Sequence, residues 1–149
     1  MNPIPFGEIT HVIQLAVAPV FLLAGIGTVL SVLTNRLGRS VDRRRVLAHI
    51  LSQVNHGLQE ATAASAAEEL QTIERRIRLI YVSISLDVSA ALFVCLLVAL
   101  AFVDALVVAD FSRIIAALFV LAMLALIGAL VVFLREIFLA VNAPRSAIR

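Results

Sequence analysis

An arginine-rich stretch, residues 35–78, separates the first two of three long apolar segments. It carries eight of the twelve basic residues of the chain, all of them arginine: Arg36, Arg39, Arg43, Arg44, Arg45, Arg75, Arg76 and Arg78. Because arginine is costly to move across a bilayer, short loops that are rich in it stay on the cytoplasmic side. We therefore expect this stretch to fix the orientation of the apolar segments on either side of it.

The apolar content excludes an ordinary water-soluble domain. Of 149 residues, 62% are hydrophobic and 15% are charged, against roughly 45–50% and 25% in an average globular domain. A spanning helix needs about 20 apolar residues, and the segments 12–34, 79–103 and 114–134 each satisfy this requirement. The sequence predicts an all-α integral membrane protein, a single membrane domain with three transmembrane helices.

The charges outside these segments predict the topology. The lead, residues 1–11, has no arginine, and the linker 104–113 holds two aspartates and one arginine, whereas the tail 135–149 holds three arginines. By the positive-inside rule, the lead and the linker face outward and the tail faces the cytoplasm. We expect a multi-pass protein of the inner membrane with its N-terminus outside and its C-terminus in the cytoplasm.

The stretch 35–78 itself shows the pattern of a cytoplasmic helical hairpin. Gly38 and Ser40 are typical of one helix ending and another beginning, and apolar residues then recur every three or four positions from Leu47. The turn falls at 55–57 or at the alanine-rich 61–64. A capping box begins at Ser65, so we expect the second arm to start there and to continue as one helix through the second span.

Asp87 is the one carboxylate deep inside a predicted span. It continues the apolar stripe of the second arm, which comprises Leu70, Ile73, Ile77, Ile80 and Ile84, so it is expected on the face that packs against other helices. A charge there is costly, and two interpretations stay open. Asp87 is either part of an ion or proton site, or a hydrogen-bonded clamp between helices. The polar residues expected near it are Ser31, Thr34, Ser83 and Ser85.

The arginines of 35–78 are expected to contact anionic lipid headgroups. Nucleic acid is not expected as a partner, because no stacking aromatics lie between them. His49, His56 and Glu60 share a helix face, but a solvated surface explains this spacing and no metal or cofactor is expected. The sequence has no nucleophile–base pair and no phosphate-binding glycine loop, so we expect no enzymatic activity.

Five blocks together resemble a family of three-pass bacterial membrane proteins known only as domain of unknown function 2721. The most specific blocks are Leu-Thr-Asn-Arg-Leu at 33–37 and Phe-Leu-Arg-Glu at 133–136; the full set is 18–27, 33–43, 75–80, 94–100 and 133–140. The likeness extends over about 8–140. It implies a three-helix membrane protein and transfers no activity and no catalytic residues.

Two functions remain after these exclusions. A three-helix protomer has little interior, so we expect a homo-oligomer. The favoured interpretation is a channel-like or ion-transport assembly with Asp87 at its site. The alternative is a non-enzymatic scaffold or regulatory anchor that acts through the cytoplasmic hairpin.

Overall fold

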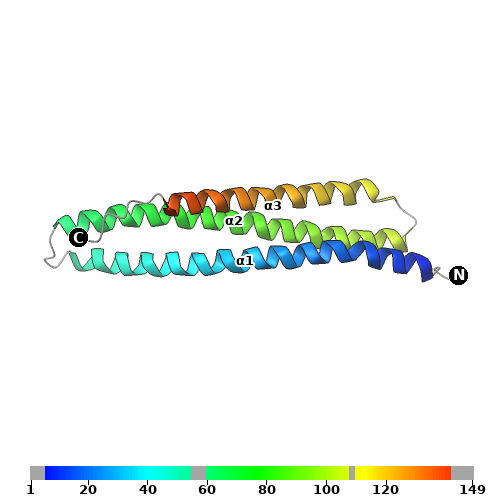
Figure 1. The fold of residues 1–149 in the computed structure, drawn as a ribbon, viewed down its shortest axis with the longest axis horizontal. Helices are drawn as coiled ribbons and strands as arrows, with labels where there is room; N and C mark the ends of the chain where they lie inside the picture. Colours follow the sequence, from blue (N-terminus) through cyan, green and yellow to red (C-terminus); the bar gives the residue numbers. More distant parts are fainter. Residues whose placement is uncertain (1–5, 55–59, 108–109, 142–149) are drawn as a thin grey trace. The chain divides into compact units, whose positions relative to one another are not determined.

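Three helices follow one another along the chain (Figure 1). The computed structural model describes residues 6–54, 60–107 and 110–141, in which α1 is Phe6–Val54, α2 is Glu60–Leu106 and α3 is Ser112–Val141. Each helix contains a stretch long and apolar enough to cross a membrane: Val17–Ser52, Ala66–Asp104 and Ser112–Ala140. The predicted all-α class with three helices of spanning length is confirmed.

The helix breaks predicted within 35–78 are wrong. Gly38 and Ser40 lie inside α1, and Ser65 lies inside α2 together with the alanine-rich 61–64, so neither a hairpin helix starting at Ser40 nor one starting at Ser65 exists as a separate element. A single glycine weakens a helix by only about 1 kcal/mol, and good helix formers flank these positions. The alternative turn, 55–57, lies outside the described residues.

The unbroken helices are longer than a bilayer requires. With a rise of about 1.5 Å per residue, the 49 residues of α1 and the 47 of α2 each reach roughly 70 Å, more than twice the ~30 Å hydrocarbon core. The 30 residues of α3 reach only about 45 Å. The first two helices therefore have the length to cross a membrane and continue beyond it.

Gly38→Ala is expected to stabilise the protein. Gly38 is exposed within α1, and a Cβ built on it meets nothing within 4 Å. Alanine should therefore gain close to the full difference in helix propensity, up to about 1 kcal/mol. Unfolding in detergent, followed by circular dichroism, measures the gain. Gly38→Pro is the matched control and should lower stability; a helix break at Gly38 would instead leave both variants near the parent.

Contacts divide the chain into two compact units. The first combines Met1–Ser31 with Ser85–Ala129, and the second combines Val32–Ile84 with Leu130–Arg149. In the first unit, the buried residues Ile26, Ala90, Val94 and Ala122 bring all three helices into one apolar cluster. Two of the four are alanines, and small side chains let membrane helices approach closely.

The core of the second unit lies between α1 and α2. Leu47 of α1 and Ala66, Ile73 and Ile77 of α2 are buried together, and Leu51 packs against them. All of these positions except Ala66 belong to the two stripes that the sequence predicted, spaced by three or four residues. The cytoplasmic hairpin predicted between the first two spans is therefore not supported as a separate element, because the packed residues belong to the continuous helices α1 and α2.

The start of α3 is held by two aspartates. Asp110 accepts a hydrogen bond from the backbone N–H of Ser112 at 3.1 Å, and Asp104 accepts one from Phe111 at 3.0 Å. The hydrogen bonds from Ser112 hold the pKa of Asp110 below its usual range, because they favour the ionised form. Asp110 thus accepts an N–H from the first turn of α3.

Candidate functional site

Glu136 is fully buried in the second unit, although it lies almost at the end of α3. Its exposed fraction is 0%, the same as that of Leu33. The apolar run of α3 ends at Leu134, and the next residues, Arg135 and Glu136, are both charged. Arg135 is exposed and Glu136 turns inward, so helical geometry sends two neighbouring charges to opposite environments.

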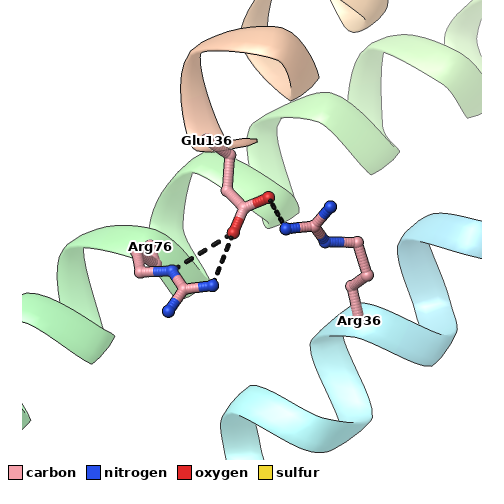
Figure 2. Close-up of polar contacts among 3 residues, drawn as sticks. All are labelled: Arg36, Arg76 and Glu136. Carbon is pink, nitrogen blue, oxygen red and sulfur yellow. Dashed lines mark hydrogen bonds and ion pairs between the residues drawn. The ribbon is translucent and has the colours of Figure 1, made fainter. Parts of the chain in front are cut away.

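Two arginines from two other helices meet this carboxylate (Figure 2). Arg76 of α2 donates from Nε and Nη2 to Oε1 of Glu136, at 3.2 and 3.1 Å. Arg36 of α1 places Nη2 2.7 Å from Oε2, a charge contact whose angle does not make a hydrogen bond. Glu136 is therefore shared by two guanidinium groups, and we call these three residues the charge triad.

The surroundings of the charge triad strengthen the attraction between its charges. The side chains of Arg36 and Arg76 are only 23% and 26% exposed, so their charges are less screened than those of surface pairs. Cζ of Arg36 also lies 5.3 Å from the centre of the Phe133 ring, a cation–π contact that comes from the same helix as Glu136. The triad connects α1, α2 and α3 at one level of the second unit and carries a net positive charge.

A second ion pair between α1 and α2 is exposed. Arg43 donates from Nε and Nη2 to the two oxygens of Glu69 at 2.8 and 3.0 Å, and the two side chains are 54% and 43% exposed. Water competes for both partners, so good geometry alone gives little stability.

A double-mutant cycle on Arg43→Gln and Glu69→Gln should give a coupling of only about 0.2–1 kcal/mol. Each single variant should lower the detergent unfolding midpoint slightly, and the effect should shrink in high salt because exposed charges are screened. Arg45 and Asp42, which lie 3.9 Å apart on one exposed face, provide a control cycle that should be near zero. A coupling well above 1 kcal/mol would show that this pair is shielded from water.

Asp87 is the other fully buried carboxylate of the described residues, and it lies in the first unit. Its exposed fraction is 0%, which agrees with the packing face predicted from the stripe. Neither Oδ1 nor Oδ2 has a hydrogen-bond partner in the described part of the protein. Asp87 and Glu136 are both buried, but only Glu136 has arginine side chains beside it.

The other predicted site residues differ in exposure, and their grouping around Asp87 stays a prediction. In the first unit, Ser31 and Ser85 are exposed. In the second unit, Ser83 is buried and Thr34 is exposed. Of the predicted set, Ser83 alone shares the buried face of α2 with Asp87, one helical turn earlier. His49 is exposed, and His56 lies outside the described residues.

The predicted headgroup arginines fall into two groups. Arg36 and Arg76 are partly buried against Glu136, whereas the other six are exposed: Arg39, Arg43, Arg44, Arg45, Arg75 and Arg78. Contact with lipid headgroups stays a prediction for the exposed ones.

Comparison with known proteins assigns the chain to a family. Residues 16–146 match the family model described as "Protein of unknown function (DUF2721)". The chain belongs to the DUF2721 family. No curated protein and no solved structure shows a significant match.

Each residue of the charge triad lies in one of the sequence blocks that resemble the DUF2721 family. Arg36 lies in the block at 33–37, Arg76 in the block at 75–80 and Glu136 in the block at 133–136. Glu136 was not among the predicted site residues, because a charge at the end of a span is typically solvated. The signal that identifies it is an acidic residue beside an arginine, at the helix end that faces the basic stretch.

Proposed function

We propose that this DUF2721 protein is a non-enzymatic membrane scaffold whose first two helices continue beyond the bilayer as a helical arm. The arm comprises residues 37–54 of α1 and 60–75 of α2. The observation that carries the proposal is that neither helix breaks between its apolar segment and the arm.

The surface of the arm supports a location outside the hydrocarbon layer. Its exposed side chains include charges of both signs: Arg39, Arg44, Arg45, Glu68, Glu74 and Arg75. Such a density of charge is unfavourable in lipid and ordinary for a helix pair in water. The 18 residues from 37 to 54 give the arm a reach of about 27 Å.

The charge triad lies at the base of this arm. Arg36 and Arg76 are the residues that precede and follow it in sequence, and Glu136 ties both to α3. In this role the triad holds the arm against the end of the third helix. We place this level at the cytoplasmic interface of the inner membrane, since the arginine distribution favours that side, with exposed arginines near anionic headgroups.

Cysteine labelling tests the orientation. In a Cys95→Ser background, Ser112→Cys should react with a membrane-impermeant maleimide on intact spheroplasts, whereas Ser52→Cys should react only after the membrane is permeabilised. Both serines are exposed. The reverse pattern would invert the proposed topology.

Photo-crosslinking tests the scaffold role. A benzophenone amino acid at the exposed Arg44 or Gln71 of the arm should capture one defined protein in living cells. The same probe at the exposed Leu124 of α3, within an apolar span, is the matched control and should not capture that protein. Capture of the same chain would support a homo-oligomer joined through the arms; no protein adduct at either arm position would argue against a scaffold.

Ion transport by a homo-oligomer is the second candidate, favoured by the buried and unpartnered carboxylate of Asp87. One observation weighs against a pore along a shared axis that is lined by Asp87: this side chain is enclosed within its own protomer. Flux of H⁺ or Na⁺ into liposomes that contain the protein, lost in Asp87→Asn, would restore this function to first place.

A further inference from the structure

Asp87 is fully buried, and neither of its carboxyl oxygens has a hydrogen-bond partner among the described residues. Ala90, one turn further along α2, is packed with Ile26 of α1 and Ala122 of α3. The partly buried residues against that cluster are also apolar: Leu22, Leu23, Ala91, Phe93, Ala125 and Leu126. An ionised carboxylate without a cation or hydrogen-bond donors is strongly disfavoured in such surroundings.

The charged groups of the first unit lie far from Asp87 along its helices. On α2, Asp104 is 17 positions further on, about 25 Å along the helix. On α3, Arg113 precedes the packed Ala122 by nine positions, about 13 Å. The described part of α1 in this unit carries only Glu8 and His11, at the opposite end from Ile26. Asp104 and Arg113 are not among the residues of the cluster.

A metal ion does not fit this position. Na⁺ and Ca²⁺ take several oxygen ligands, and the described residues contain no group of three or more His, Cys, Asp or Glu side chains that could hold a metal ion. The helices also approach closely here, since a Cβ on Gly128 of α3 would lie 3.5 Å from Cδ1 of Leu86, the residue before Asp87. A hydrated ion is too large for such packing. A proton needs one carboxyl oxygen and no additional volume.

We propose that Asp87 is a reversible proton-binding site, occupied at neutral pH in the resting protein. The carboxylic acid is the form that the closed cluster accepts. The proton leaves to water only when α1, α2 and α3 separate enough to solvate the carboxylate, and it returns when they close. Opening of this unit and release of one proton are therefore the same event. This inference stands independently of the scaffold role.

Infrared spectroscopy tests the proposal. In a maltoside detergent, which has no ester carbonyl, the protein at pH 7 should show the C=O stretch of a protonated carboxylic acid, and Asp87→Asn should remove it. The band should shift in D₂O, because a reversible site exchanges its proton. Asp110→Asn is the matched control: it removes an exposed carboxylate and should leave the band unchanged.

Asp87→Leu gives a second difference spectrum in case the asparagine variant folds poorly, and it should lack the same band. If the parent shows no such band at pH 7, Asp87 is ionised and the proposal is wrong. A band that stays unshifted after prolonged exposure to D₂O would also overturn it, because the acid would then be a permanent structural group rather than a binding site.

Discussion

Glu136→Ala is expected to lower the free energy of unfolding by about 3 kcal/mol, the low end of the cost of breaking a buried ion pair. The substitution leaves the guanidinium groups of Arg36 and Arg76 without an anion while both stay only 23% and 26% exposed. Two like charges then remain near each other across α1 and α2. Titration with sodium dodecyl sulfate in mixed micelles, followed by circular dichroism, measures the loss.

Arg135→Ala is the matched control for this prediction. Arg135 is the neighbouring charge on α3, is exposed, and has no ion pair among the described residues, so its removal should cost less than about 0.5 kcal/mol. Glu136→Gln should lie between the two, because it keeps an acceptor oxygen and loses the charge. If Glu136→Ala costs no more than Arg135→Ala, the charge triad does not hold the helices together.

Loss of the charge triad should also loosen the contact between the arm and α3. Spin labels at Ser52 of α1 and Arg135 of α3, both exposed, should give one narrow distance distribution in the parent protein. Glu136→Ala should broaden this distribution, because the triad no longer ties α3 to the first two helices. Arg43→Gln should leave the distribution narrow, since Arg43 connects α1 to α2 only.

Much of the fold could be predicted because apolar spacing and charge distribution are properties of the chain itself. The three apolar segments, and the stripe that runs from Ile73 through Ile77 to Asp87, follow from side-chain chemistry and helical period. The continuity of α1 and α2 could not be predicted in this way. Gly38 and Ser65 have the local character of helix ends, but neighbouring turns and the packed pair of helices outweigh a preference of about 1 kcal/mol.

The charge triad was beyond prediction for a different reason. Arg36, Arg76 and Glu136 are separated by 40 and 60 positions, and no periodic pattern relates residues on three helices. Only the packing of α3 against α1 and α2 in the second unit decides that Glu136 turns inward while Arg135 turns outward. The burial of Asp87 could be predicted, because it lies on the apolar stripe of its own helix. That its carboxylate has no hydrogen-bond partner among the described residues could be learned only from the packing of the three helices.

Asp87→Leu is expected to raise the free energy of unfolding by about 1–2 kcal/mol, because it removes a buried polar group that has no hydrogen-bond partner. Leucine branches at the same carbon as aspartate, so it keeps the shape of the side chain while its added volume limits the gain. The same detergent titration measures the change. Asp87→Asn keeps a polar group in the apolar cluster and should stay close to the parent.

Asp104→Leu is the decisive comparison, because it makes the same change on the same helix at a carboxylate that has a partner. Oδ1 of Asp104 accepts the N–H of Phe111 at 3.0 Å, and its loss leaves a backbone donor unpaired, so stability should fall by about 1 kcal/mol. Opposite signs at the two positions would show that Asp87 does not clamp the helices. Asp87 would then be a residue that lowers the stability of the fold, and a loss of stability of this kind is typical of a functional site. Destabilisation at both positions would instead identify Asp87 as a structural clamp.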